Sequence, residues 1–567
     1  MTKKNYRIFL SALAVSGFLT ALGLLAAPPF TAPLGSIDPW VYTGLAFDYD
    51  QLVDRFGPTY YASRVVHIFF VHFFDKFFGQ PFGVILLKFA IICSSSCAAY
   101  LWALRKFESH EISLCLSAIC SWTPYLAGHW LGDHYDLTAT SFLILASLFG
   151  IWPRRETKIT QLIGGLCLAF AANTNQFTLA VYFVMIPGFL LLLLSQQQKL
   201  FLFFLFTAVG FLTGSLFTQA ALWYAHPVWR ENALVVIQTI RSLIGGGMAD
   251  WYVSTGEAFR LKYFYVITPL SIGLIALILS KLSLFAKMDA DTQSKKSKEL
   301  VGAGLIGILP TIFFLLFSEF LKSGILTREY YLIYLFPGIL IPTGFVLNHI
   351  KKCSVLNITS LRLFVFGCFT LWFIGAPTTN FLFNSINFGS LLFCTLFLIA
   401  LFIFSKKPAL SCLAVVGCLL LYIYLPFSIK RGERPFEIEW ICRHEVKSLL
   451  NTVKKSAPVR DGKIGFWYEK ENKYLYSLQS SFLWGYSLIS DEKSPFPQNL
   501  LKASQENKAG IFILDTDNNK LGQKIEKLKD AAFSEGYYVE IISRRKLDEI
   551  VGKACYAYLK IKKASKP

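Results

Sequence analysis

The sequence predicts a polytopic α-helical membrane protein that ends in a soluble, extracytoplasmic α/β domain. Three observations support this fold class. Hydrophobic residues make up 54% of the 567 residues, charged residues make up 16%, and the apolar residues gather in long blocks. Soluble chains carry charge at about a quarter of their positions, whereas blocks of about 17–25 apolar residues have the length that spans a bilayer. These features argue against a soluble enzyme, a disulfide scaffold, a disordered protein and a coiled coil.

The formal net charge of +19 would also suit a nucleic-acid-binding protein. The Lys and Arg residues, however, lie in short clusters between the apolar blocks, as they do in membrane proteins. We therefore expect membrane lipids, and no nucleic acid, among the partners.

The apolar blocks predict about thirteen transmembrane helices. The first block, residues 8–27, follows the basic residues Lys3, Lys4 and Arg7. A cleaved signal peptide has an apolar core of only about 7–15 residues, so we interpret this block as an uncleaved span with a cytoplasmic N-terminus. The other predicted spans are residues 82–104, 112–127, 137–152, 159–172, 177–194, 200–224, 263–286, 300–317, 330–347, 361–374, 388–404 and 410–427.

The positive-inside rule tests this count, because it places Lys and Arg in cytoplasmic loops near span ends. With the N-terminus inside, every predicted inside loop contains such a residue: Arg105, Lys106, Arg154, Arg155, Lys158, Lys199, Lys287, Lys295, Lys296, Lys298, Lys351, Lys352, Lys406 and Lys407. Because successive connections alternate between the two sides of the membrane, residues 28–81, 128–136, 225–262, 318–329 and 428–567 are predicted to lie outside.

The composition changes near residue 428, so we divide the chain into a transmembrane domain, residues 1–427, and a soluble extracytoplasmic (periplasmic) domain, residues 428–567. Strand-like and helix-like runs alternate in the second domain, which predicts an α/β fold. The strand-like runs are 464–468, 510–514, 538–542 and 556–561, and the helix-like runs are 440–455 and 520–534. Cys442 and Cys555 lie in this domain, where an oxidising compartment could pair them.

Acidic residues gather in the predicted outer loops rather than inside the spans. Asp38 lies about ten residues beyond the first span, and residues 60–78 of the same loop mix charged and aromatic side chains, as amphipathic helices in the membrane interface do. The short second outer loop contains Asp133, His134 and Asp136. No chain of buried acids or histidines crosses the spans, which argues against an ion-coupled transporter.

This arrangement resembles the membrane glycosyltransferases of the GT-C superfamily, which take sugars from polyprenyl-phosphate carriers. The resemblance rests on Asp38 after the first span, a helical segment in the same loop, acids between spans three and four, and a soluble domain at the end of the chain. The resemblance covers roughly the first 350 residues. Residues 38–64 look most like protein-mannosyltransferase and aminoarabinose-transferase relatives.

The resemblance implies a GT-C-like enzyme of the bacterial inner membrane. Such an enzyme moves one sugar from an undecaprenyl-phosphate-type donor to an extracytoplasmic acceptor, which could be lipid A, a cell-surface glycan or a protein. Three alternatives stay open. The first is a polysaccharide polymerase or ligase, which usually has its functional Arg and His in a large late loop. The second is a lipid-linked-sugar transporter or flippase, which needs a polar path through the spans or inverted repeats. The third is a non-catalytic scaffold, which would not need Asp38.

Asp38 is the general base that the resemblance implies. Transfer from a lipid phosphate needs a base for the acceptor proton and positive charge for the departing phosphate. A carboxylate tethered close to a span end can meet the donor at the membrane surface. A single displacement inverts the anomeric centre and needs one such carboxylate, unlike hydrolysis with its paired acids. Alternatively, Asp38 is a turn-forming residue before Pro39.

Asp133, Asp136 and His134 are candidates for acceptor or metal binding. Some superfamily members hold a divalent metal with such acids, and here the oxygen ligands of Asp133 and Asp136 would suit Mg²⁺ or Mn²⁺. His134 with His129 also leaves a zinc site open. Alternatively, Asp136 caps the fourth span, which is predicted to begin at residue 137.

Binding of the donor phosphate needs Arg or Lys on the outer face. Our candidates are Arg64, Arg328, Arg241 and Lys262. The resemblance singles out Arg328, because family members use an Arg near a late span close to the phosphate. Contact with lipid headgroups is the alternative for each residue, although the positive-inside rule should deplete basic residues on this face.

Overall fold

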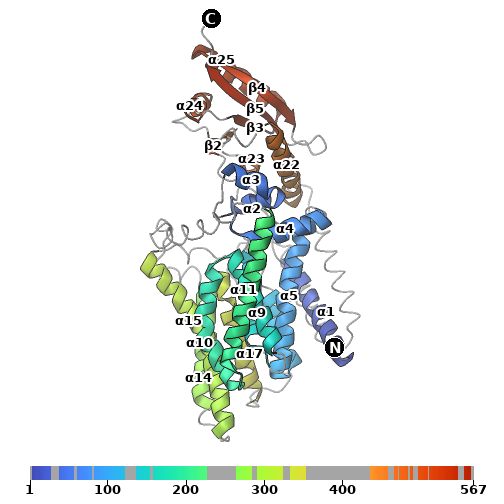
Figure 1. Ribbon diagram of the computed structural model, residues 1–567, viewed down its shortest axis with the longest axis vertical. Helices are drawn as coiled ribbons and strands as arrows, with labels where there is room; N and C mark the ends of the chain where they lie inside the picture. The colour runs from blue at the N-terminus through green and yellow to red at the C-terminus, as the bar shows by residue number, and fades with distance from the viewer. Residues whose placement is uncertain are drawn as a thin grey trace.

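The structure is a computed structural model of the chain (Figure 1). It describes residues 3–26, 37–56, 61–79, 82–121, 136–153, 157–225, 263–283, 290–322, 332–352, 435–456, 465–469, 472–482, 486–489, 496–507, 510–546 and 554–563. A helical bundle forms one end of the molecule and a sheet with its helices forms the other, and α2 to α4 lie between them (Figure 1).

The bundle contains a helix for each of the first ten predicted spans. These helices are α1 (Lys3–Ala26), α5 (Phe82–Phe107), α6 (His110–Ser121), α8 (Asp136–Gly150), α9 (Thr157–Thr174), α10 (Phe177–Ser195), α11 (Leu200–Ala225), α14 (Tyr263–Ser283), α15 (Ala290–Leu321) and α17 (Phe336–Lys352), which follows the 3-10 turn η4 (Ile333–Leu335). The predicted spans 361–374, 388–404 and 410–427 lie outside the described residues. The mainly helical fold is therefore confirmed, and the count of thirteen spans stays a prediction.

Five described helices are long and apolar enough to cross a membrane: Phe82–Phe107, Phe177–Ser195, Leu200–Ala221, Gln293–Leu321 and Ile333–Lys352. Their outer surfaces are apolar too. On α11, Phe201, Leu212 and Leu216 are all at least 60% exposed. A helix that exposes large apolar side chains along its length suits a lipid environment better than water.

Small and hydroxyl-bearing residues join the helices inside the bundle. Ser96 on α5 and Ser16 on α1 both reach Ser117 on α6, with Oγ–Oγ distances of 2.7 and 3.0 Å. These buried hydroxyls satisfy one another, as polar side chains between membrane helices do.

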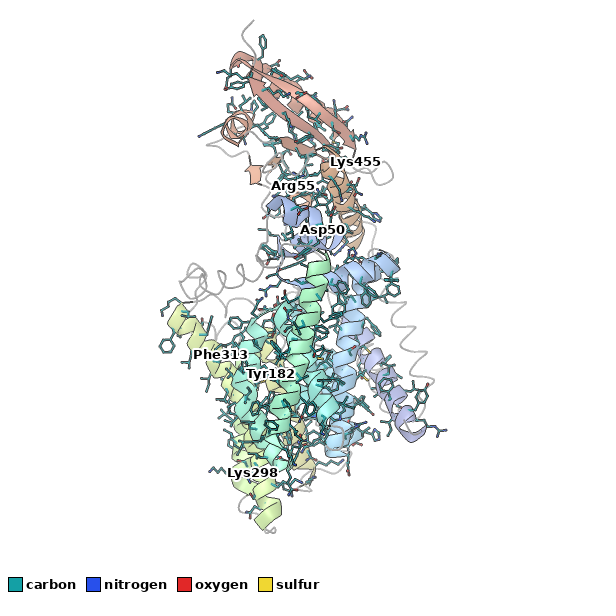
Figure 2. All side chains as sticks on the ribbon, viewed as in Figure 1. Asp50, Arg55, Tyr182, Lys298, Phe313 and Lys455 are labelled. Carbon is teal, nitrogen blue, oxygen red and sulfur yellow. The ribbon has the colours of Figure 1, made fainter. Side chains whose placement is uncertain are left out.

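The loops that the sequence places inside the cell meet at one end of the bundle. Their contacts are Lys106–Glu299 at 2.8 Å, Lys351–Glu111 at 3.9 Å, the Arg105 guanidinium 5.4 Å from the Trp152 ring centre, and Gln198 Nε2 donating to the Trp152 carbonyl at 3.1 Å. Lys298 lies at this end of the molecule, far from Asp50 of the first outer loop (Figure 2).

Three helices connect the bundle with the sheet. They are α2 (Asp38–Phe47), α3 (Tyr49–Phe56) and α4 (Val65–Phe78), and α4 lies across the upper end of the bundle (Figure 1). One face of α4 is buried through Val66 and Val71, whereas Phe69, Phe73 and Phe77 are exposed. This aromatic face matches the amphipathic interfacial helix that residues 60–78 predict.

The described residues of the C-terminal part form a five-stranded mixed sheet with helices. Its elements are α22 (Pro435–Ser456), β1 (Gly465–Tyr468), α23 (Lys473–Ser480), β2 (Tyr486–Ile489), α24 (Gln498–Asn507), β3 (Ile511–Asp515), α25 (Asn518–Ser534), β4 (Tyr537–Lys546) and β5 (Cys555–Lys563). The strand order is β2-β1-β3-β5-β4, with β1 parallel to β2 and β3, and with β5 antiparallel to β3 and β4. The four predicted strands correspond to β1, β3, β4 and β5.

Cys442 and Cys555 are both buried, and neither takes part in a disulfide. Cys442 on α22 belongs to the apolar cluster that includes α2, whereas Cys555 on β5 belongs to the cluster beneath α25. The Cys555 thiol donates to the Asp515 carbonyl at 3.3 Å. The disulfide that the sequence left open is therefore not formed, because the two thiols lie in different cores.

Lys524 anchors α25 on the sheet. Its Nζ lies 2.5 Å from Asp515 Oδ2 and 2.9 Å from Glu469 Oε1, above the Trp467 ring. Burial by itself would lower the pKa of Lys524, but the hydrogen bonds to Asp515 and Glu469 and their charges outweigh it and raise that pKa. A raised folded-state pKa means that this stabilisation is fully present below the pKa of the unfolded chain and is lost only as the pH rises through the folded value.

We expect Lys524→Met to lower the stability of the protein at neutral pH by about 1–3 kcal/mol, since Asp515 would keep a buried carboxylate without its ammonium partner. The melting temperature of the detergent-solubilised protein measures this loss. Lys529→Met is the matched control, because Lys529 pairs with the exposed Glu526 on the same helix and such surface pairs contribute little. Equal shifts for the two variants would contradict the prediction.

Candidate functional site

Asp38 begins α2, directly before Pro39 in the first turn of the helix. Proline is favoured there because its fixed φ suits the first turn. The Asp38 side chain is partly exposed, and Tyr61 Oη donates a hydrogen bond to its Oδ1 at 2.9 Å. The positive end of the α2 dipole also favours a carboxylate at this place. A carboxylate is thus held at the start of α2, in contact with the segment that leads into α4.

Aromatic and hydroxyl side chains connect this carboxylate with the bundle. The Tyr42 ring packs edge-on against Tyr61 at 5.6 Å and against His67 at 5.7 Å, measured between ring centres. His67 Nδ1 lies 3.1 Å from Thr138 Oγ1 on α8. Thr138 is two residues beyond Asp136, so the first and second predicted acidic sites lie at the same end of the bundle.

Asp136 begins α8 and is 2% exposed. Its Oδ1 accepts hydrogen bonds from Tyr334 Oη and, at 3.3 Å, from Asn175 Nδ2. Asn175 also donates to Tyr334 Oη at 2.7 Å. These contacts join α8, the connection between α9 and α10, and η4. The carboxylate therefore makes long-range contacts in addition to its position at the helix start.

Arg64 precedes α4 and is 1% exposed. Its Nη1 donates to the Thr174 carbonyl at 3.1 Å and to Gln176 Oε1 at 2.7 Å. Residues 174–176 therefore contact Arg64 on one side and, through Asn175, Asp136 on the other. In this structure Arg64 fastens α4 to the connection between α9 and α10.

The structure brings Asp38, Arg64 and Asp136 to one end of the bundle. The other predicted site residues lie outside the described residues: Asp133, His134, Arg241, Lys262 and Arg328. Within the described part of the chain, no group of three His, Cys, Asp or Glu side chains could hold a metal ion. Asp136 is the one member of the predicted metal site that is described, and two donors already engage its carboxylate.

Sequence reasoning did not single out several polar residues at this end, among them Tyr61, Asn175 and Tyr334. It also passed over Lys88, a lysine of α5 that is only 6% exposed. An ionisable residue inside a predicted span is a signal for a functional position, and this signal was available for Lys88. Asn175 and Tyr334 gave no such signal, because polar residues at span ends are common.

We expect Tyr334→Phe to lower the stability of the bundle by about 1–3 kcal/mol, because a buried carboxylate loses a hydrogen-bond donor. The melting temperature of the solubilised protein is the measurement. Tyr6→Phe, on an exposed tyrosine of α1, should leave it unchanged. A wild-type melting temperature for Tyr334→Phe would show that Asp136 does not depend on this contact.

No model of a known protein family matches the chain, and no curated protein matches it either. Two solved structures match the chain over almost its whole length. The crystal structure of ArnT from Cupriavidus metallidurans bound to undecaprenyl phosphate has 10% sequence identity and a TM-score of 0.47, and covers 98% of each chain. The apo state of that protein has 12% identity and a TM-score of 0.42, with the same coverage.

Proposed function

We propose that this protein is an inverting membrane glycosyltransferase that moves a sugar from a polyprenyl-phosphate carrier to an extracytoplasmic acceptor. The observation that supports this most directly is the position of Asp38. Its carboxylate is partly exposed, is held by Tyr61, and lies close to α4, whose exposed phenylalanines suit the bilayer surface. A base at this level can meet both a lipid-borne donor and a water-borne acceptor.

In the proposed reaction, the acceptor hydroxyl gives its proton to the Asp38 carboxylate and its oxygen attacks the anomeric carbon. The bond from that carbon to the phosphate oxygen breaks, and its electron pair leaves with the phosphate. Attack opposite the leaving group inverts the anomeric centre. Tyr61 fixes the Asp38 side chain through its hydrogen bond, so that less orientation is lost in reaching the transition state.

Positive charge must stabilise the departing phosphate. We assign this role to the basic residues predicted on the outer face: Arg64, Arg241, Lys262 and Arg328. Arg64 donates hydrogen bonds to Thr174 and Gln176 through Nη1. In the proposal it therefore has two roles: it holds the connection between α9 and α10 beside the phosphate, and it supplies positive charge. A Mg²⁺ or Mn²⁺ ion bound by Asp133 and Asp136 stays part of the proposal, and no step above depends on it, because Asp133 lies outside the described residues.

We further propose that the N-terminus is cytoplasmic, that α2 to α4 and the C-terminal domain, residues 428–567, lie on the periplasmic side of the bacterial inner membrane, and that residues 1–427 form the transmembrane domain. Two features support a common side for the first outer loop and the C-terminal domain. Trp40 and Leu45 of α2 share one apolar core with Leu449 and Leu478, and the basic loops meet at the opposite end of the bundle. A periplasm-active reporter fused after Pro567 should be active, and an inactive fusion would overturn this orientation.

The experiment that tests the function uses purified protein in liposomes and a panel of radiolabelled undecaprenyl-phosphate sugars. Lipid A, a cell-wall glycan and an unfolded protein are offered as acceptors in separate reactions. We expect label to move from one donor to one of these acceptors. Folded protein that consumes none of the donors would overturn the proposal. In the same assay, loss of transfer on chelation and its recovery with Mg²⁺ or Mn²⁺ would add a metal to the mechanism.

A further inference from the structure

The connection between α9 and α10, residues 174–176, fixes the guanidinium of Arg64. Thr174 ends α9, and the last carbonyls of a helix have no partner within the helix. Arg64 Nη1 donates to the Thr174 carbonyl at 3.1 Å and to Gln176 Oε1 at 2.7 Å. Nη1 carries two N–H groups, and these two oxygens account for both. A phosphate that binds Arg64 must therefore use Nη2 or Nε.

The side chain of Gln176 does not cap its own helix. Gln176 directly precedes α10 and makes no side-chain capping hydrogen bond there. Asn175 serves the start of α10 instead, because its Oδ1 accepts from the Phe177 N–H at 3.0 Å and its carbonyl accepts from the Thr178 hydroxyl at 2.7 Å. The amide of Gln176 thus makes its contact with Arg64, 112 residues earlier in the chain.

Arg64 also belongs to the turn that holds the proposed base. Its backbone N–H donates to the Tyr61 carbonyl at 3.1 Å, and Tyr61 Oη donates to Asp38. Helix α4 begins directly after Arg64 and lies across the upper end of the bundle, where its exposed phenylalanines suit the bilayer surface (Figure 1). One short turn therefore carries both the residue that holds the base and a residue that can bind the phosphate of a carrier lipid.

The oxygen that Gln176 offers to Arg64 is neutral, and this has a chemical consequence. A carboxylate at the same place would accept the same hydrogen bond and would form an ion pair with the guanidinium. It would then compete with any other anion for the positive charge. This competition would be strong, because Arg64 is only 1% exposed and charges interact more strongly away from water. An amide oxygen orients the guanidinium and adds no negative charge, which suits an arginine that binds an anionic ligand.

We propose that Gln176 is a positioning residue for the sugar donor. It holds the Arg64 guanidinium towards the carrier phosphate and, as a neutral acceptor, adds no charge that would oppose the phosphate. This inference rests on the proposed function and specifies how its donor is bound. Gln176 does not touch the donor and acts through Arg64.

The test compares wild type with Gln176→Glu and Gln176→Met in the purified full-length protein. Glutamate has the shape of glutamine and accepts the same hydrogen bond, but it adds a negative charge, whereas methionine removes the oxygen acceptor. Gln197→Glu is the matched control, because Gln197 is an exposed glutamine beyond the other end of α10. Four quantities are measured: the Kd for undecaprenyl phosphate, the KM for the donor and for the acceptor in the assay above, and the melting temperature.

We expect Gln176→Glu to raise the Kd for undecaprenyl phosphate and the KM for the donor about tenfold or more, the effect of weakening one hydrogen bond to a charged group. The KM for the acceptor and the melting temperature should stay at wild-type values. Gln176→Met should raise the same two constants about threefold, since the guanidinium keeps only one of its two fixing contacts. Gln197→Glu should change none of the four quantities.

A residue that only joins α4 to α10 would behave differently, because glutamate preserves that contact. Wild-type binding of undecaprenyl phosphate by folded Gln176→Glu would overturn the inference and leave the proposed function intact. An equal rise of the donor and acceptor KM would overturn it too. If Gln176→Glu does not fold, Gln176→Met decides: raised donor constants support the inference, and wild-type constants overturn it. Wild-type protein that neither binds undecaprenyl phosphate nor transfers sugar would instead remove the proposed function, and the inference with it.

Discussion

Asp38→Asn should abolish sugar transfer and leave the protein folded. Asparagine has the shape of aspartate and its side-chain oxygen can still accept the hydrogen bond that Tyr61 donates. It cannot take the proton of the acceptor hydroxyl. A positioned general base contributes about 10²–10⁴ to the rate, so kcat should fall by a factor in that range. The KM for the donor should change little, because the base acts on the acceptor.

The matched control is Asp50→Asn, the same substitution at an exposed aspartate of the same outer loop. It should transfer sugar at the wild-type rate. The melting temperatures of both variants should equal that of wild type. Full turnover by Asp38→Asn would remove Asp38 as the base, and equal losses in both variants would point to the charge of the loop rather than to one carboxylate.

The sequence predicted the bundle well because a bilayer imposes its own length and charge rules. A run of apolar residues long enough to span it has few alternatives to a helix. The helix ends were less predictable. Helix α15 begins at Ala290, whereas the predicted span begins at residue 300. The first ten residues of α15 are mainly polar and carry no hydropathy signal, although several of them are good helix formers.

The sheet was predicted less completely than the bundle. Strand β2 was missed because it has only four residues, Tyr486–Ile489. Its partner β1 is equally short, but its run of apolar and aromatic residues was recognisable. Short buried strands carry too few residues for periodicity to distinguish them from other apolar segments.

The partners of the site residues could not be predicted, because they are distant in the sequence. The position of Asp38 follows from its tether to the first span, whereas its hydrogen bond with Tyr61 follows from tertiary packing. The same holds for Asp136, whose contacts Asn175 and Tyr334 come from separate loops. No local propensity encodes such contacts, and residue types alone do not select them.

Trp40→Ala should separate the first outer loop from the C-terminal part. Trp40 is fully buried in the core that α2 shares with α22 and α23. Truncation of a buried tryptophan costs about 3–5 kcal/mol, and here it also removes the ring beneath the buried Arg443 guanidinium. We expect a lower melting temperature and faster proteolytic release of the C-terminal part from the membrane-bound chain.

Phe533→Ala is the control for this loss, because Phe533 is a large aromatic residue of the C-terminal domain that is 84% exposed. Its truncation should change the stability by no more than about 0.5 kcal/mol. A Trp40→Ala variant with wild-type melting temperature and proteolysis would show that the contact of α2 with the C-terminal part does not depend on this core. The two principal variants should also fail differently. Asp38→Asn should lose activity at an unchanged melting temperature, whereas Trp40→Ala should lose activity together with the packing that holds α2 against α22 and α23.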